Sequence, residues 1–207
     1  MALELAELLD PAHTALVTQE CQEGVIGKSS ALPGLAEGVA RVGMVENIAR
    51  LARAARRAGV RVIHCTAERR PDGLGANRNA RLFQYMAKAK TPLLPGSDAV
   101  KLVPELGPEP GDLVLARLHG LSPFQGTELD FVLRNEGVTT IVGVGVSVNV
   151  AIQNFAFDAV NSSYQMVIPR DAVAGFPADY VEQVFANTLG AIATLCTTDD
   201  VLAAWRG

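Results

Sequence analysis

The strongest constraint on the fold is the alternation of short apolar runs with amphipathic segments of helical period. Six runs of the strand type occur at residues 14–20, 60–66, 112–118, 139–145, 164–169 and 191–197. Strands that are apolar throughout and are separated by helices form a parallel sheet covered on both faces. The sequence therefore predicts an α/β fold of Rossmann-type topology, a three-layer sandwich with a six-stranded parallel sheet.

The segments between these runs have the pattern of helices. Segment 35–58 carries apolar side chains every three or four residues, which predicts one continuous helix that ends at Gly59. Further helices are expected at 127–137, 149–163, 179–190 and 199–205, with a short one around 79–89. The rest of 71–110 is rich in proline and irregular, and such long segments are usually lids, binding loops or subunit contacts. Together with the apolar helix 35–58, this segment favours a homo-oligomer.

Composition limits the classes of partner. A chain of 207 residues with 49% hydrophobic and 19% charged residues can bury a sizeable core, which indicates a single domain over 1–207. A net charge of −4 gives no electrostatic reason to expect nucleic acid or an anionic membrane. No apolar run approaches the roughly 20 residues that span a bilayer. We expect a small-molecule substrate as the partner.

The cysteines and the amino terminus indicate the compartment. Cys21, Cys65 and Cys196 are far apart, and no pair has the spacing of metal ligands. The amino-terminal segment MALELAELLD is acidic and lacks the basic start of a secretory signal. These features predict a cytoplasmic protein with free thiols, no metal and no other cofactor.

Two glycine motifs resemble nucleotide-binding loops but depart from them. In QEGVIGKSS, Gln22 stands where a phosphate-binding loop needs glycine, and Pro33 follows where its helix should run. In GVGVSV, Gly143 and Gly145 match a dinucleotide-binding motif, but Val148 replaces its third glycine. We interpret the two glycines as easing a tight turn between a strand and a helix.

The residues that follow the strands are the candidates for chemistry, because open parallel sheets bind ligands at the carboxyl ends of their strands. Glu20 ends the first strand, where partial burial would suit a general acid or base. Arg117 and His119 leave the third strand on one face, since strand side chains alternate with a period of two. The alternatives are a surface carboxylate for Glu20 and a loop histidine bonded to the backbone for His119.

In this order and spacing, the strand ends resemble those of the isochorismatase-like hydrolases, also called the cysteine hydrolase superfamily. The resemblance runs from residue 15 to about residue 201 and implies one isochorismatase-like domain. The matching motifs are Glu20-Cys21-Gln22, 122–127 (SPFQGT), 145–149 (GVSVN), Asp158-Ala159 and Asp171-Ala172.

The resemblance implies roles for particular positions. Catalytic positions fall on Glu20, Arg117 and Ala151, where the family has aspartate, lysine and the cysteine nucleophile. Substrate-binding positions are expected at His119, Phe124, Val146, Ser147 and Asn149. The resemblance also implies a cis peptide bond between Val146 and Ser147.

The lysine position is ambiguous by one residue. Counting forward from Asp112 along the strand gives Arg117, whereas counting back from Phe124 gives Leu118. We favour Arg117, because a loop absorbs an extra residue more easily than a strand ladder does. Arginine keeps the positive charge but does not transfer protons, a task that His119 could perform.

The expected function depends on position 151, where this chain has alanine and the family has its cysteine nucleophile. Without a thiol there, the covalent route of the family is unavailable, and Cys21 and Cys65 are poor substitutes. The true isochorismatases also lack the cysteine and cleave a vinyl ether by acid catalysis. The resemblance therefore implies noncovalent acid catalysis from Glu20, and three arginines (Arg69, Arg70 and Arg117) favour a small anionic metabolite.

Two further expectations follow from the resemblance. The metal-binding amidases of the family have an Asp-x-His pair after the second strand, and HCTAERRPDG lacks it. We therefore expect a metal-independent protein in which His64 is a hydrogen-bonded core side chain. The alternative to a hydrolase is a catalytically inactive isochorismatase-like fold that binds a ligand or serves as a subunit.

Overall fold

The structure is a computed structural model that describes residues 4–206. Within them, a parallel sheet of seven strands has the order β3-β2-β1-β4-β5-β7, and β6 pairs with β4. The strands are β1 (Thr14–Gln19), β2 (Arg61–Ala67), β3 (Leu113–Arg117), β4 (Thr140–Val146), β5 (Gln165–Pro169), β6 (Val173–Ala174) and β7 (Thr194–Cys196). The α/β class and the six expected strands are confirmed. β6 is the additional strand, and its two residues are too few for a recognisable period.

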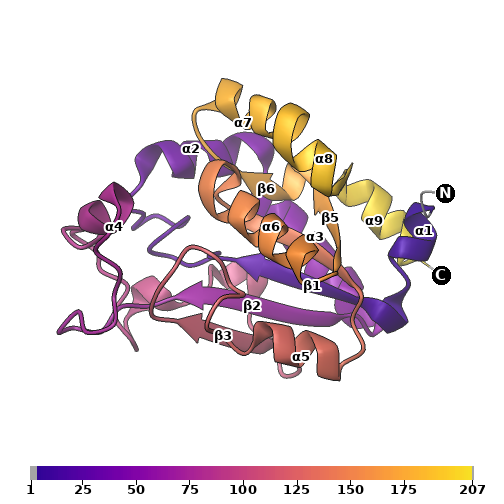
Figure 1. Ribbon diagram of the computed structural model, residues 1–207, viewed down its shortest axis with the longest axis horizontal. Helices are drawn as coiled ribbons and strands as arrows, with labels where there is room; N and C mark the ends of the chain where they lie inside the picture. Colours follow the sequence, from indigo (N-terminus) through magenta and orange to yellow (C-terminus); the bar gives the residue numbers. More distant parts are fainter. Residues whose placement is uncertain (1–3, 207) are drawn as a thin grey trace.

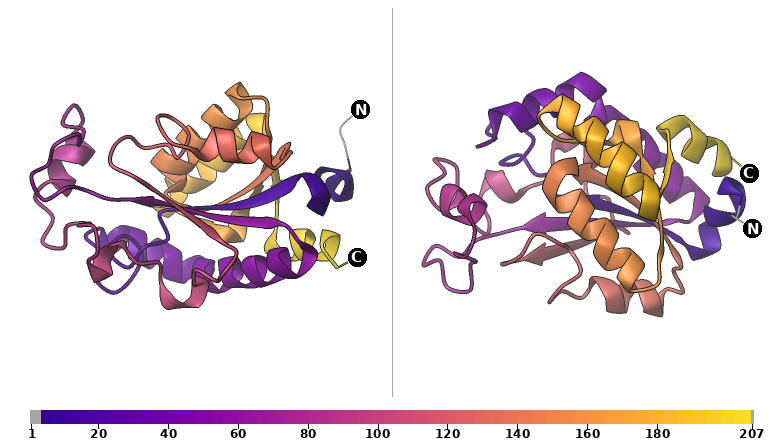
Figure 2. Two further views of the ribbon diagram at one scale, coloured as in Figure 1. Left: turned by 90° about the horizontal axis from the view of Figure 1, so that it is seen from below. Right: turned by 45° about the horizontal axis from the view of Figure 1, so that its top comes forward.

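Helices cover both faces of the sheet (Figures 1 and 2). The helices of the first face are α2 (Pro33–Val42), α3 (Met44–Ala58) and α9 (Thr198–Ala204), and those of the second are α5 (Leu129–Asn135), α6 (Gln153–Asn161), α7 (Ala178–Val184) and α8 (Gly190–Ile192). α1 (Leu5–Leu8) precedes the sheet, and α4 (Arg81–Met86) lies beyond its carboxyl edge. The left view of Figure 2 shows the sheet edge-on between the two layers, each with its own hydrophobic core.

The expected helices differ from the observed ones in detail. Segment 35–58 is two helices, because Gly43 adopts the left-handed conformation (φ 63°) between α2 and α3. Gly59 ends α3 in the same conformation (φ 77°), as expected. π-Helical turns at Val148–Ile152 and Phe185–Leu189 adjoin α6 and α7, and short 3₁₀ turns occur at Pro11–His13, Asp98–Val100, Pro104–Leu106 and Arg170–Ala172.

A buried polar network joins the sheet to α3. His64 is fully buried, and its Nδ1 lies 2.9 Å from Oγ1 of Thr18. Its Nε2 lies 3.4 Å from Oδ2 of Asp112, which also accepts a 2.6 Å hydrogen bond from Arg56. The expectation of a hydrogen-bonded core histidine is confirmed. Burial lowers the pKa of His64 below its usual value, so that the ring is held neutral.

The carboxyl ends of β1, β2 and β3 point to one edge of the sheet, at the left of Figure 1. The long segment between β2 and β3, which includes α4, crosses this edge. No helix in the described part of the chain has the length and apolar character that crossing a membrane requires. The residues that follow the strands therefore lie at this carboxyl edge, next to α4.

Candidate active site

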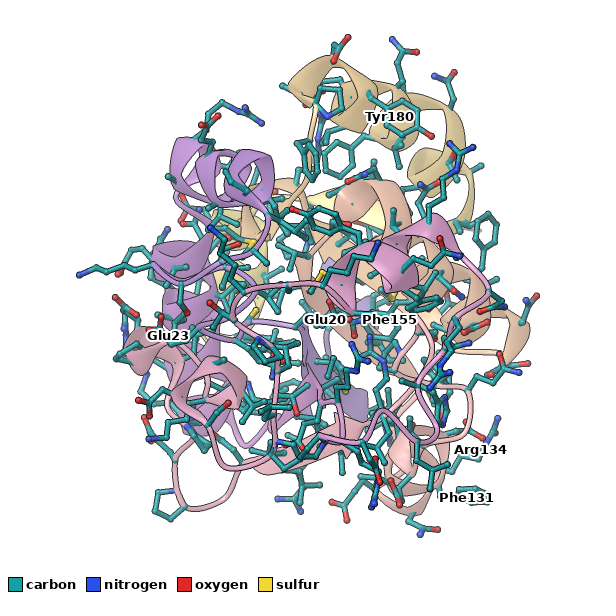
Figure 3. The ribbon with its side chains drawn as sticks, turned by 90° about the vertical axis from the view of Figure 1, so that its left-hand side faces the viewer. Glu20, Glu23, Phe131, Arg134, Phe155 and Tyr180 are labelled. Atoms are coloured by element: carbon teal, nitrogen blue, oxygen red, sulfur yellow. The ribbon has the colours of Figure 1, made fainter. Side chains whose placement is uncertain are left out.

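Glu20 directly follows β1 and turns away from the path of the strand. Its φ of 54° lies in the left-handed region, and its N–H donates to the carbonyl of Cys65 at 2.9 Å. The side chain is 20% exposed. Figure 3, seen from the carboxyl edge, places Glu20 near the centre of this face. The half-buried carboxylate is therefore open to a small molecule at the end of the sheet.

Arg117, the last residue of β3, forms an ion pair with Glu20. Its Nη2 donates to Oε1 of Glu20, and the same oxygen accepts a 3.3 Å hydrogen bond from Gln19. The Arg117 side chain is only 3% exposed and also reaches the carbonyls of Thr66 and Leu121, each at 3.5 Å. No residue between 4 and 206 donates to the second oxygen of Glu20, Oε2. That oxygen is free to act on a bound molecule.

A cavity of about 770 Å³ opens beside this ion pair. Seven of the eight expected site residues line it, namely Glu20, Arg117, His119, Val146, Ser147, Asn149 and Ala151. The peptide bond between Val146 and Ser147 is cis, as expected. The structure thus brings together residues that are up to 131 positions apart in the sequence.

Phe124 is the expected site residue that does not line the cavity. It is buried in the second core, with its ring centroid 5.8 Å from those of Phe155 and Tyr164. The turn of the SPFQGT motif directs the ring inward, where it packs between two aromatic side chains. In the structure Phe124 is therefore a core residue, and its position does not support the expected role in substrate binding.

Three buried polar atoms at the end of the sheet have no hydrogen-bond partner in the described part of the chain. They are Oε1 of Gln19, Nε of Arg117 and Oδ1 of Asn149. Buried polar atoms are usually satisfied, so an unpaired group needs an explanation. Arg117 and Asn149 line the cavity, but their unpaired atoms are themselves buried, and Oδ1 of Asn149 lies next to Gly175.

Of the two residues considered for the lysine position, Arg117 is the one that contacts Glu20. Leu118 is 40% exposed, whereas Arg117 makes the ion pair with Glu20. His119 is exposed and its ring lies against Gly126, where an added Cβ would approach Cε1 to 2.7 Å. His119 lines the cavity and forms no hydrogen bond within residues 4–206.

Ala151 lies in the first turn of the π-helical segment that leads into α6, and its methyl group borders the cavity. None of the three cysteines lines this cavity. All three are buried, and burial raises the pKa of Cys21, Cys65 and Cys196 to about 12. Thiols in this state are poor nucleophiles.

Positive charge collects on one side of the cavity. Arg69 and Arg78 both line it, and their Nη2 atoms lie 3.1 and 3.8 Å from the position of a Cβ added at Gly73. Neither arginine forms an ion pair within the described residues. Arg70 instead pairs with Asp72 at 2.7 Å and does not line the cavity.

Arg78 is a site residue that sequence reasoning missed. It lies in the irregular segment, where no strand end or period marks its position. Among residues 4–206, no group of three or more His, Cys, Asp or Glu side chains is arranged to hold a metal ion. The candidate chemistry is therefore that of Glu20, Arg117 and the two unpaired arginines.

Known proteins similar to this chain share the whole fold. A family model described as an isochorismatase domain matches residues 14–200. The ureidoacrylate amidohydrolase RutB of Agrobacterium fabrum is 30% identical over 188 residues, which cover 84% of this chain and 82% of that protein. RutB of Methylobacterium radiotolerans is 32% identical over 176 residues, covering 79% and 68%. The crystal structure of a cysteine hydrolase from Pseudomonas syringae pv. phaseolicola superposes with a TM-score of 0.82 at 25% identity, covering 94% of this chain and 93% of that one.

Proposed function

Because this chain belongs to the isochorismatase family, we propose that it is a hydrolase that cleaves a small anionic molecule without a covalent intermediate. Glu20 is the group that transfers protons. The observation that carries this proposal is the ion pair of Glu20 and Arg117 at a cavity that Ala151 also borders. An alanine supplies no nucleophile, so water is the attacking group.

The relatives support a carbon–nitrogen bond as the target. Two of them are named ureidoacrylate amidohydrolases, a name that describes hydrolysis of a ureido group on a carboxylic acid. Arg69 and Arg78 provide the positive charge that a carboxylate needs, and neither is neutralised within residues 4–206. We therefore propose ureido or amide derivatives of carboxylic acids as the substrate class.

Arg117 donates a hydrogen bond to Oε1 of Glu20 and leaves Oε2 without a donor within residues 4–206. Glu20 then acts first as a base. Its free Oε2 takes a proton from water while the water oxygen attacks the carbonyl carbon, giving a tetrahedral intermediate. The protonated Glu20 next donates this proton to the leaving nitrogen as the carbon–nitrogen bond breaks. The acid role expected from the sequence is thus the second half of the cycle.

In this mechanism, Ala151 leaves room for the attacking water, and the helix that follows it stabilises the intermediate. The small methyl group leaves room beside Glu20 for a water molecule. The amino end of the helical segment 148–161 carries a partial positive charge, which stabilises the negative oxygen of the intermediate. Asn149 and Arg117 both line the cavity and are the polar residues that orient the substrate.

The test begins with a library of ureido and amide derivatives of carboxylic acids. Compounds that raise the unfolding temperature of the purified protein are then assayed for hydrolysis. A single turnover in oxygen-18 water should label the product and leave the intact protein at its natural mass. Label in the Glu20 carboxylate would overturn the noncovalent route, and stabilisation by many compounds without turnover of any would favour a binding protein.

A further inference from the structure

α4 presents an apolar face to the cavity and not to the core. Leu82, Phe83 and Met86 line the cavity together with the polar Gln84, and none of the six residues of α4 is buried. Met86 lies one turn beyond Leu82 and Phe83, so the three apolar side chains share one side of the helix. An apolar face of this kind normally packs against protein. Here its neighbour is the cavity beside Glu20.

The opposite wall of the same cavity is also apolar. It includes Val25, Leu32 and Leu35, which lie before and at the start of α2. The hydroxyl of Tyr85 on α4 donates to the carbonyl of Ala31 at 3.0 Å and so connects the two walls. Figure 1 shows α4 beyond the carboxyl edge of the sheet, with α2 above it and to its right. The cavity is therefore lined by apolar side chains of α4 and of residues 25–35, and the Tyr85 hydrogen bond links these two segments.

The size of the cavity exceeds what a short ureido acid fills. A volume of about 770 Å³ falls in the range of about 300–1,000 Å³ that encloses drug-sized ligands. We propose that the substrate is amphipathic. Its cleavable group lies at Glu20, and an aliphatic or aromatic body of several carbons lies between α4 and the Val25–Leu35 wall. This inference deepens the proposed function and shares its site, but it can be tested by binding alone.

The probes are straight-chain carboxylates from butanoate to dodecanoate, measured by titration calorimetry on the full chain. Burial of each added methylene should tighten binding by about fourfold until the cavity is filled. Phe83→Ala should weaken dodecanoate binding by about tenfold and change butanoate binding little. The control Phe131→Ala removes a ring that is 71% exposed on α5 and points away from Glu20 (Figure 3), and it should change neither.

Two further variants separate this inference from the catalytic proposal. Arg78→Gln should weaken the binding of every carboxylate by a similar factor, because it removes a positive charge and leaves the apolar lining of the cavity unchanged. Glu20→Gln should abolish hydrolysis and keep the dependence on chain length. If hydrolysis is never found but this dependence persists, the proposed function fails and the apolar subsite stands. The subsite would be overturned if the affinity for carboxylates did not vary with chain length. It would also be overturned if Phe83→Ala and Phe131→Ala weakened dodecanoate binding equally.

Discussion

Arg117 on β3 donates a hydrogen bond to Glu20 at the end of β1, although β2 separates the two strands in the sheet. The guanidinium spans the end of β2 and touches the carbonyl of Thr66 on the way. The ion pair therefore fixes three strand ends to one another. Its position couples the stability of this edge of the sheet to the charge of the carboxylate proposed to act in catalysis.

Removing the guanidinium tests this coupling. Arg117→Met should lower the free energy of unfolding by about 2–4 kcal/mol, because a half-buried carboxylate loses its partner. The double variant Arg117→Met/Glu20→Gln should be more stable than Arg117→Met alone, since the uncompensated charge is gone. Urea unfolding measures both effects. Equal stability of the single and double variants would show that the two residues are not coupled.

The reactivity of a thiol introduced at position 151 measures the electrostatic field at the amino end of the helix. Ala151→Cys should react with iodoacetamide near neutral pH at least about a hundredfold faster than Cys21, Cys65 or Cys196, which burial holds at a pKa of about 12. The new thiol borders the cavity at the amino end of a helix, and this position favours the thiolate.

The control for this measurement is Ala40→Cys, an exposed thiol on α2. The rate of alkylation as a function of pH gives the pKa of each new thiol. Ala151→Cys should titrate below Ala40→Cys. A higher midpoint at position 151 would mean that burial outweighs the field of the helix and of Arg117, and the proposed stabilisation of negative charge there would be wrong.

The buried network predicts a loss of stability in mild acid. The pKa of His64 is lowered by burial from 6.5, so the unfolded chain binds a proton at a higher pH than the folded protein does. The free energy of unfolding should therefore fall as the pH drops below about 6.5. His64→Gln should reduce this dependence between pH 6.5 and 5 and cost about 1–3 kcal/mol at pH 7.5, where the ring makes two polar contacts.

Asp112 adds a second loss at lower pH. Burial alone would raise the pKa of this carboxyl, but hydrogen bonds from Arg56 and the Glu109 N–H hold it below 3.8. Its contribution to stability is present above about pH 3.8 and is lost as the pH falls further. In His64→Gln, the free energy of unfolding should still fall with decreasing pH below about pH 3.8. A curve with no acid dependence above pH 5 in the wild type would contradict the account of His64.

The sequence was sufficient to predict the strands and most of the residues that line the cavity, because apolar runs and the residues after them follow local rules. The ion pair of Glu20 and Arg117 follows from the strand ends of a parallel sheet. The inward turn of Phe124 does not, because its direction depends on Phe155 and Tyr164, which come later in the chain.

Other features depend on tertiary structure in the same way. Nothing local in the sequence shows that Gly43 breaks a helical pattern with a left-handed turn, or that Arg78 in an irregular segment reaches the cavity. The apolar face of α4 is a further example, because the sequence of the helix does not show that this face lines a cavity. Homo-oligomerisation, the cytoplasmic location and metal independence stay predictions.

The kinetic comparison of Glu20→Gln with Glu68→Gln tests the central claim most directly. Both glutamates line the cavity, but only Glu20 forms an ion pair with the Arg117 guanidinium; Glu68 contacts Arg117 through its backbone N–H, which Glu68→Gln keeps. With a substrate identified from the library, Glu20→Gln should lower kcat/KM by at least about a hundredfold. Glu68→Gln should keep it within about threefold. Glu20→Gln should unfold at a lower temperature than the wild type, because the buried Arg117 guanidinium loses its charged partner, so kcat/KM is compared at a temperature where both variants are folded. If Glu20→Gln retained the wild-type kcat/KM, Glu20 would not be the group that transfers protons, and the proposed site would be wrong.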